Sequence, residues 1–230
     1  MNALSIIVPV LDEAAGIEAC LAPLQPMRAR GAEVVVVDGA SLDATRDLAA
    51  PLADRVLQSA RGRALQMNAG AGAARGATLV FLHADTILPA EADAAISRAV
   101  ADGARWGRFD VSIAGSDPLL AVVAVMMNAR SRLTGIATGD QAIFVRREDF
   151  AAAGSFPEIA LMEDVALSKR LKRIARPACL RERVVTSGRR WEGRGTLRTI
   201  VLMWRLRLAY ALGADPGRLA RRYDVERSSG

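Results

Sequence analysis

Residues 79–86 read LVFLHADT, so that four apolar residues lead directly into a histidine and an aspartate. A short, continuous apolar run of this kind is typical of a strand that is buried on both faces. In open α/β sheets, ligands bind beyond the carboxyl ends of such strands. We therefore expect a central strand at residues 78–83, with Asp85 at its exit beside a cleft. The alternative is that Asp85 only caps the helix that starts near Pro89.

Strands and helices are expected to alternate around this segment. Apolar runs predict strands at 4–10, 33–38 and 55–58. Helical spacing predicts a helix after each of them, at 14–30, 42–50 and 63–75. Strands that alternate with helices of this length form βαβ units and a mostly parallel sheet. With 230 residues, of which 51% are hydrophobic, the chain is long enough for one large domain or slightly more. We predict an α/β fold with helices flanking a central sheet.

The second half of the chain has a less regular pattern. It predicts strands at 105–114 and 142–145, a last basic helix after Pro216, and other helices at 90–101, 117–133, 161–174 and 196–212. The helix at 117–133 starts with Asp117 as cap and is so apolar that we expect it to be a buried core helix. We divide the chain into a main domain, residues 1–191, and a C-terminal basic amphipathic helical extension, residues 192–230.

The composition excludes several classes of protein. The N-terminus lacks the basic region and the long apolar run of a signal peptide, and no stretch offers the ~20 apolar residues of a membrane-spanning helix. Only Cys20 and Cys179 are present, so the chain has neither a disulfide framework nor a zinc cluster. These features predict a cytoplasmic location.

The charge is unevenly distributed along the chain. Residues 1–164 carry 14 basic and 20 acidic side chains, whereas residues 165–230 carry 17 basic and 5 acidic ones. This asymmetry predicts a basic face near the C-terminus that meets phosphates, in lipid or in nucleic acid.

Three of the predicted strands end in acidic residues. Asp12 and Glu13 follow the first strand, Asp38 ends the second, and Asp85 follows the central one. Like charges crowded at one sheet edge cost free energy unless something binds there. Mg²⁺ is typically held by one or two carboxylates together with substrate phosphate oxygens. The glycine-rich motifs of dinucleotide-binding folds and P-loop NTPases, and the nucleophile elbow of α/β-hydrolases, are absent.

A series of short motifs resembles those of family 2 glycosyltransferases, the inverting GT-A group that uses nucleotide-diphosphate sugars. The motifs are SIIVPVLDE (5–13), VVDGASLDAT (36–45), GRALQMNAG (62–70), HAD (83–85), FVRR to GSF (144–156), ED (163–164) and RRW (189–191). The resemblance covers roughly residues 4–191 and is closest to a small bacterial subgroup that carries His-Ala-Asp. It implies a GT-A-like fold and the transfer of a sugar to a hydroxyl acceptor with inversion.

The resemblance also assigns roles to individual residues. Asp85 would hold Mg²⁺ or Mn²⁺, Asp164 would be the catalytic base, and Glu163 would orient Asp164 or the acceptor. The nucleotide sugar would be bound by Pro9, Asp12, Glu13, Asp38, Gly39, Arg63, Asn68, Ala84, Asp85, Arg190 and Trp191. The acceptor side would be formed by Gly139, Asp140 and Gln141. UDP-sugars are favoured as donors, and GDP-sugars are the second choice.

Two positions depart from the family pattern. His83 stands where the family has the first aspartate of its D-x-D motif, so Asp85 alone would hold the metal and His83 would contribute indirectly. Ser187 stands where processive members have glutamine, which argues against the synthesis of a polymer.

Two other functions fit part of the pattern. A sugar-1-phosphate nucleotidyltransferase would need a glycine-rich start after the first strand, and this chain lacks it. A non-catalytic membrane- or nucleic-acid-binding module on the same fold would not need the intact Asp85 and the acidic pair at 163–164, so we expect no nucleic-acid partner.

The helix at 196–212 places tryptophan and leucine residues among arginines. Two interpretations of this pattern are open. Either the helix lies on an anionic membrane, peripheral on its inner face and close to a lipid-linked acceptor, or it packs on the domain and the acceptor is soluble.

Overall fold

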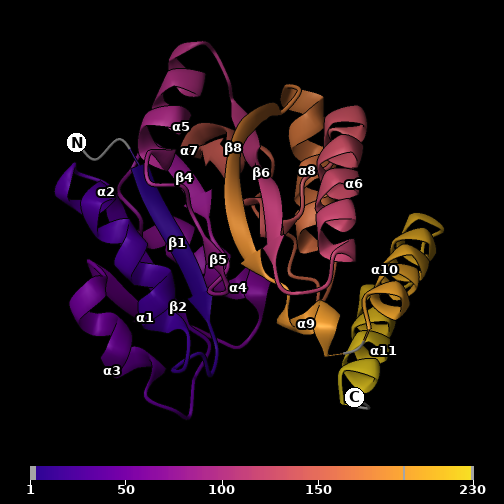
Figure 1. Ribbon diagram of the computed structural model, residues 1–230. Helices are drawn as coiled ribbons and strands as arrows, with labels where there is room; N and C mark the ends of the chain where they lie inside the picture. Colours follow the sequence, from indigo (N-terminus) through magenta and orange to yellow (C-terminus); the bar gives the residue numbers. More distant parts are fainter. Residues whose placement is uncertain (1–3, 194, 229–230) are drawn as a thin grey trace.

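The computed structural model describes residues 4–193 and 195–228, with their side chains except those of Arg190, Glu192 and residues 224–228. Within this part of the chain, eight strands form one sheet in the order β3-β2-β1-β4-β7-β6-β8-β5 (Figure 1). The strands are β1 (Leu4–Val10), β2 (Glu33–Asp38), β3 (Arg55–Gln58), β4 (Thr78–Phe81), β5 (Thr86–Ile87), β6 (Trp106–Ala114), β7 (Ile143–Arg146) and β8 (Ala178–Ser187).

The strands from the N-terminal half run parallel to one another. β1 lies between β2 and β4, with Val10 opposite Asp38 and Leu4 opposite Thr78, and β3 pairs with β2. β7 is antiparallel to both β4 and β6, β8 is parallel to β6, and the short β5 is antiparallel to β8. The predicted α/β fold with a mostly parallel sheet is confirmed. Because β2, β1 and β4 are parallel neighbours, their carboxyl ends meet at one edge of the sheet.

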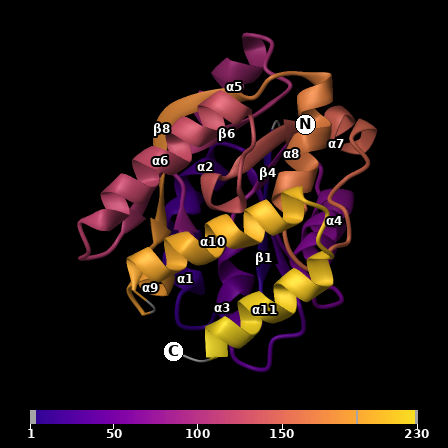
Figure 2. The ribbon, with the colours of Figure 1, turned by 90° about the vertical axis from the view of Figure 1, so that its right-hand side faces the viewer.

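Helices cover both faces of this sheet (Figure 2). Ile6 and Ile7 are adjacent in β1 and point to opposite faces, and both are fully buried. Ile6 belongs to an apolar cluster with α1, α2, α5 and α6, whereas Ile7 belongs to a cluster with α4, α7 and α8. The helices are α1 (Ile17–Leu21), α2 (Gln25–Ala29), α3 (Thr45–Ala49), α4 (Arg63–Ala73), α5 (Ala92–Ala101), α6 (Leu119–Thr134), α7 (Arg147–Ala152), α8 (Glu163–Ile174), α9 (Arg189–Glu192), α10 (Thr196–Ala211) and α11 (Pro216–Ser228).

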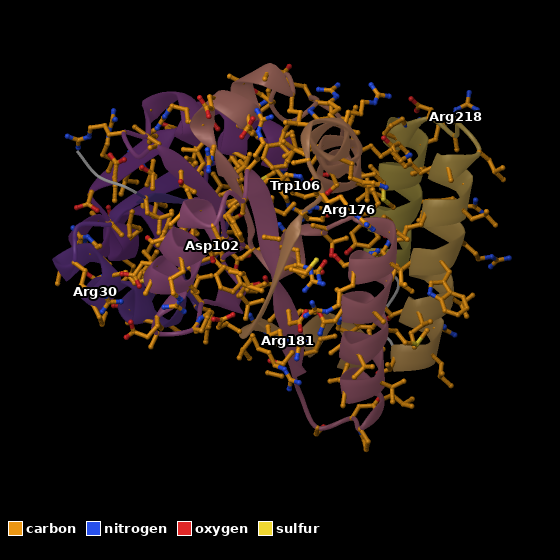
Figure 3. All side chains as sticks on the ribbon, turned by 90° about the horizontal axis from the view of Figure 1, so that it is seen from above. Arg30, Asp102, Trp106, Arg176, Arg181 and Arg218 are labelled. Atoms are coloured by element: carbon orange, nitrogen blue, oxygen red, sulfur yellow. The ribbon has the colours of Figure 1, made fainter. Side chains whose placement is uncertain are left out.

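Trp106 joins the sheet to the layer that contains α8. Its ring is fully buried, and its indole Nε1 donates a hydrogen bond to the Ala175 carbonyl oxygen at 2.8 Å, just beyond the end of α8. Figure 3 shows Trp106 in the interior, with Arg30 and Arg218 at opposite outer edges of the molecule. The polar tip of the ring is therefore satisfied although the ring lies in the core.

Some predicted elements differ from those observed. The helix expected at 14–30 is divided into α1, a 3-10 turn at Ala22–Leu24, and α2. Pro23 and Pro26 lack the N–H groups that a continuous helix would use, so the backbone tightens and restarts between them. The short β5 and the long β8 were not predicted from the sequence.

The expectation that residues 117–133 form a buried core helix is wrong. One side of α6, which includes Leu120, Val123 and Met127, is buried against the domain. The opposite side exposes Leu119, Val122, Val125, Met126 and Leu133. Apolar residues occur all around this helix, so the sequence does not reveal that only one side meets the sheet.

The C-terminal helices pack on the main domain through a third apolar cluster. Leu202 and Leu206 of α10 and Leu219 of α11 contact Met162 and Val165 at the start of α8. The core-packing interpretation of residues 196–212 therefore holds for one side of α10. Within the described residues no helix is both long enough and apolar enough to cross a membrane. The domain boundary at residues 191 and 192 stays a prediction.

Gly70 explains how α4 lies so close to the sheet. A Cβ at this position would come within 2.5 Å of Ile7 Cγ2 and 2.9 Å of Val37 Cγ2, and both side chains are buried. Gly70→Ala is therefore expected to lower the free energy of unfolding by roughly 1–2 kcal/mol, because overpacking outweighs the gain in helix propensity. Urea unfolding measures the difference.

Gly72, in the same helix, provides the matched control. A Cβ there would meet nothing within 4 Å, so Gly72→Ala should raise the free energy of unfolding by about 0.5–1 kcal/mol. Equal effects of the two substitutions would contradict the packing of α4 on β1 and β2.

Candidate active site

A cleft of about 290 Å³ lies where β1 and β4 end and α4 begins. Five of the residues assigned to nucleotide-sugar binding line it, namely Pro9, Glu13, Arg63, Ala84 and Asp85. The parallel arrangement of β1 and β4 brings these residues together from three separate parts of the sequence. The cleft therefore lies at the sheet edge predicted from the strand-end carboxylates, and two of these carboxylates, Glu13 and Asp85, line it.

The other two strand-end carboxylates hold loops beside this cleft. Asp38 is fully buried and accepts hydrogen bonds from the backbone N–H groups of Ala40 and Ser41, at 3.1 Å each. Asp12 is exposed, and its Oδ1 accepts a hydrogen bond from the Leu42 N–H at 2.8 Å. Both side chains fix the loop that follows β2, and neither lines the cleft.

Asn68 and Gly39 also act on the surrounding backbone. Asn68 exchanges two hydrogen bonds with the backbone of Phe156, at 2.9 and 3.0 Å. A Cβ on Gly39 would lie 3.1 Å from the amide of Gln66, which donates hydrogen bonds to the carbonyl oxygens of Val10 and Val37. Gln66 ties the ends of β1 and β2 together and lines the cleft, and the sequence analysis did not single it out.

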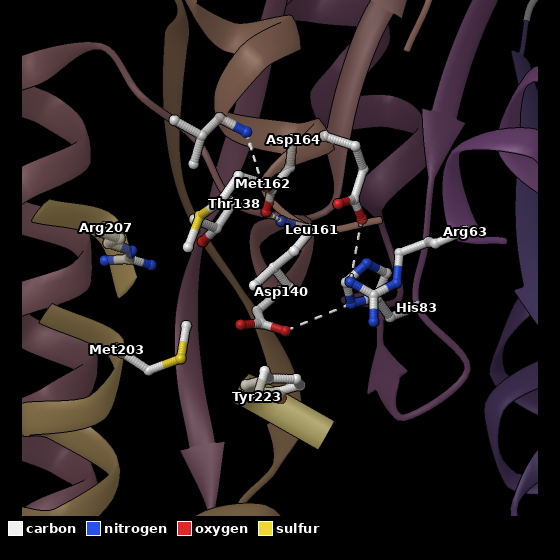
Figure 4. A pocket seen from close by; sticks show the side chains of 13 residues that line it. Arg63, His83, Thr138, Asp140, Leu161, Met162, Asp164, Met203, Arg207 and Tyr223 are labelled. Atoms are coloured by element: carbon white, nitrogen blue, oxygen red, sulfur yellow. Dashed lines mark hydrogen bonds and ion pairs between the residues drawn. The ribbon is translucent and has the colours of Figure 1, made fainter. Parts of the chain in front are cut away.

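His83 lies between the cleft and a second, smaller pocket (Figure 4). Its Nδ1 is 3.4 Å from Asp140 Oδ1. A Cβ on Gly139 would approach the imidazole within 2.1 Å, so only glycine lets this backbone lie against the ring. The histidine is thus held by Gly139 and Asp140, and its indirect contribution to the site stays a prediction.

Asp164 lines the second pocket at the start of α8. Its Oδ2 accepts a hydrogen bond from the Gly139 N–H at 2.9 Å, and its Oδ1 accepts one from the Val165 N–H at 2.6 Å. These donors orient the carboxylate and leave it partly exposed to the pocket. A carboxylate held in this way is suited to accept a proton from a bound hydroxyl group.

Glu163 lies beside Asp164 but is almost completely buried. Its Oε1 accepts a hydrogen bond from Arg63 Nη1 at 3.1 Å, which links α8 to α4. Burial raises the pKa of Glu163, and the charge of Arg63 opposes this rise. The arginine therefore stabilises the carboxylate form and is itself held at the boundary between the two pockets.

The predicted acceptor residues separate into two groups. Gly139 and Asp140 line the second pocket, whereas Gln141 is fully buried and caps the 3-10 turn at Gly139–Gln141. Trp191 of α9 lies with Asp85 and Asp140 around a smaller recess. The side chain of Arg190 lies outside the described residues.

The donor set at Asp85 fits a hard divalent cation that arrives with its phosphates. Among the described residues, no three His, Cys, Asp or Glu side chains converge to hold a metal by themselves. Asp85 and Glu13 share the cleft, and their charges act, after burial, to raise the pKa of nearby Cys20 to about 12. One or two carboxylates completed by substrate oxygens is the usual environment of protein-bound Mg²⁺.

The contribution of the C-terminal helices to this pocket was not predicted from the sequence. Met203 and Arg207 of α10 and Tyr223 of α11 line the second pocket. Met203 and Arg207 are four residues apart and therefore share one side of the helix. Nothing in the sequence indicates that this side, rather than the side bearing Arg205, turns inward.

Residues 5–116 match the family model described as glycosyl transferase family 2. The resemblance to family 2 glycosyltransferases inferred from the motifs is confirmed for this part of the chain. Among curated protein sequences, none matches the chain.

Solved structures show that the GT-A fold of the family extends over the rest of the chain. S. aureus TarS 1-349 is 18% identical, with a TM-score of 0.66, over 81% of this chain and 61% of that one. The mannosyltransferase PcManGT from Pyrobaculum calidifontis, in complex with GDP-Man and Mn²⁺, is 22% identical with a TM-score of 0.66, over 99% of this chain and 70% of that one. Glucosyl-3-phosphoglycerate synthase from Mycobacterium tuberculosis, with Mn²⁺ and UDP, is 16% identical with a TM-score of 0.58, over 80% of this chain and 71% of that one.

The likeness to these structures concerns the fold alone, because the identities are low. The chain spans about three fifths of the length of the TarS 1-349 structures.

Proposed function

We propose that the protein is a metal-dependent glycosyltransferase that moves a sugar from a nucleotide diphosphate to a hydroxyl acceptor with inversion. The observation that carries this proposal is the continuity of two pockets. The cleft at Asp85 and the pocket at Asp164 share Arg63 and His83 in their walls. A donor held in the first would present its sugar to a base in the second.

The donor side offers groups of suitable chemistry for a nucleoside diphosphate. Arg61 and Arg63 line the cleft at the N-terminus of α4, where arginine charges and helix N–H groups favour phosphate oxygens. Glu13 offers an acceptor for a ribose or base donor group. Asp85, together with the diphosphate, would hold Mg²⁺ or Mn²⁺, which when bound neutralises charge on the leaving diphosphate.

The transfer step then uses Asp164 as the base. The acceptor oxygen bonds to the anomeric carbon, the bond between that carbon and the diphosphate oxygen breaks, and the hydroxyl proton passes to Asp164. Attack from the face opposite the leaving group inverts the anomeric configuration. The Gly139 N–H holds Asp164 in place, and the Glu163–Arg63 pair supports it from the interior.

The identity of the nucleotide is proposed from the structural neighbours. TarS 1-349 has been solved with UDP-GlcNAc and with UDP, and PcManGT with GDP-Man. We favour UDP-sugars for this chain, with GDP-sugars as the second choice.

Thermal shift with UDP-, GDP- and dTDP-sugars, each with and without Mn²⁺, tests the proposed donor class. A ligand at 100 times its Kd stabilises a folded protein by about 2.7 kcal/mol, so a true donor should raise the Tm clearly. We expect at least one donor to do so, and more strongly with Mn²⁺. No shift with any of them would contradict the proposal.

The exposed side of α10 supports peripheral attachment to a membrane. Leu197, Val201, Trp204 and Leu208 are all more than half exposed and repeat at spacings of four, three and four residues. Arg198 and Arg205 lie beside this stripe, and α6 adds its own exposed apolar side chains. Trp and Leu among arginines fit a helix that lies in the membrane interface.

We therefore expect the protein to float with vesicles rich in anionic lipid at low salt. Trp204→Glu should reduce the bound fraction several-fold, because it puts a negative charge into the apolar stripe. Leu42→Glu is the matched control, since Leu42 is 97% exposed but lies in the loop before α3 and not in α10. Equal loss in both variants, or no flotation of the wild type, would refute the attachment.

A further inference from the structure

A third pocket, of about 250 Å³, lies between α6 and α10. Its apolar walls include Val123 and Met126 of α6, Trp191 of α9, and Ile200 and Trp204 of α10. Asp85, Arg63 and Glu13 of the donor cleft do not line it. The pocket is therefore separate from the nucleotide site, and its chemistry is different.

Two arginines in this apolar pocket have unsatisfied donors. Nε and Nη2 of Arg130 and Nε of Arg207 are buried and have no hydrogen-bond partner among the described residues. Neither arginine forms a salt bridge within that part of the chain. Buried charged donors without partners are costly, so such a group in a native protein calls for a ligand or another explanation.

The two guanidinium groups also act on each other. Burial, followed by the charge of Arg207, lowers the pKa of Arg130 to about 10. Burial also lowers the pKa of Arg207, although Asp164 and Asp140 counteract part of this effect. An anion that contacts both arginines would remove their repulsion and satisfy their free N–H groups.

The pocket is continuous with the base. Arg207, Asp140 and Met203 line both this pocket and the pocket that contains Asp164. Figure 4 shows Arg207 on the side of Asp140 opposite His83 and Arg63. A molecule held at Arg207 would thus approach Asp164 from the side away from the donor, where an acceptor must enter.

We infer that the acceptor is a hydroxyl-bearing amphiphile with a phosphate group, whose phosphate contacts Arg130 and Arg207, whose hydrocarbon chain lies between α6 and α10, and whose hydroxyl is the group presented to Asp164. Three buried nitrogen atoms without partners match the three terminal oxygens of a phosphate better than the two of a carboxylate. The chain is hydrocarbon because the walls are apolar and lead to the exposed apolar side chains of Met126, Val201 and Trp204. The acceptor role rests on the proposed function, whereas the binding site does not.

Octyl phosphate, below its micelle concentration and without nucleotide, tests the binding site. Trp191 and Trp204 line the pocket, so the intrinsic fluorescence should report occupancy. We expect octyl phosphate to bind at least ~10-fold more tightly than either inorganic phosphate or octyl glucoside, because each of these offers only half of the contacts. Binding of inorganic phosphate as tight as that of octyl phosphate would overturn the lipid assignment, and so would equal binding of octyl glucoside.

Variants of the two arginines separate binding from folding. Arg207→Gln and Arg130→Gln should each weaken octyl phosphate binding by ~10-fold or more. Arg173→Gln removes the same charge from an exposed position in the last turn of α8 and should leave it unchanged. Because each of the first two variants removes an unpaired buried charge, the Tm without ligand should not fall. A large fall in Tm with unaltered binding in the remaining folded protein would assign the arginines a structural role and overturn the inference.

The two proposals fail in distinguishable ways. If donors bind and are hydrolysed but octyl phosphate does not bind, this inference is wrong and the proposed function stands. If octyl phosphate binds as expected but no nucleotide sugar binds, the phosphate site stands and its role as an acceptor site falls.

Discussion

Asp164→Asn is expected to lower kcat by at least ~10²-fold while the affinity for the nucleotide sugar stays nearly unchanged. Asparagine keeps the shape of the side chain and one oxygen that can accept the hydrogen bond from the Gly139 N–H, 2.9 Å away in the native protein. It cannot accept a proton at neutral pH. Only the transfer step should therefore suffer, because Asp164 lies outside the cleft that holds the donor.

Steady-state kinetics and donor titration on the same preparation separate these effects. Glu148→Gln is the control, since Glu148 is an exposed acid in the first turn of α7 and tests the mere loss of a helix N-terminal charge. Its kcat should stay close to that of the wild type. Loss of donor binding in Asp164→Asn, with normal turnover of what remains bound, would move Asp164 to another role.

Asp85→Ala is expected to remove the dependence of donor binding on Mn²⁺. No group of three metal-ligating side chains exists among the described residues, so the metal would depend on Asp85 and on the diphosphate. Without this carboxylate the metal would lose its protein ligand and the diphosphate its charge neutralisation, so the donor affinity should fall by ~10²-fold with Mn²⁺ present. Isothermal titration with and without Mn²⁺ measures both quantities.

A second variant separates the loss of metal binding from a loss of folding stability. Asp85→Asn preserves size and should retain the Tm of the wild type, yet it should also lose most of the response to Mn²⁺. Unchanged donor affinity together with unchanged Mn²⁺ dependence in either variant would show that the metal assignment is wrong.

The sequence was sufficient to predict the centre of the fold. The LVFL run of residues 79–82 is buried, and the strands before it alternate with helices, so the parallel sheet followed from local patterns. The prediction failed for elements whose conformation depends on contacts with distant parts of the chain. β8 has three partly buried residues followed by the consecutive exposed residues Arg181, Glu182 and Arg183, so no regular alternation marks it in the sequence, and only its pairing with β6 makes it a strand.

The strand-end carboxylates show how far a site can be predicted in the same way. Asp85 and Glu13 reach the cleft, but Asp38 turns back onto the N–H groups of Ala40 and Ser41. Position at a sheet edge follows from the strand pattern. The direction of each side chain depends on the loop that follows, because short Asp side chains readily bond to backbone N–H groups nearby.

Helix α10 shows most clearly what could not be predicted from the sequence. α10 has three functional sides: Leu202 and Leu206 pack on the domain, Met203 and Arg207 line pockets, and Val201 and Trp204 are exposed. A helix with apolar residues on two sides has two sides that could pack on the domain. The spacing of the apolar residues therefore does not predict which side faces inward. The sequence alone therefore does not decide whether residues 196–212 pack on the domain or lie on a membrane.

The central claim is that the cleft at Asp85 presents a nucleotide sugar to the base Asp164 for transfer with inversion. Proton NMR of an α-linked donor hydrolysed by stoichiometric enzyme with Mg²⁺ tests it most directly, because water then takes the place of the acceptor and the configuration of the released sugar is visible before mutarotation. The account predicts that the β-anomer forms first, at a rate at least ~10²-fold lower in Asp164→Asn. First appearance of the α-anomer, or an equal rate in Asp164→Asn, would contradict it.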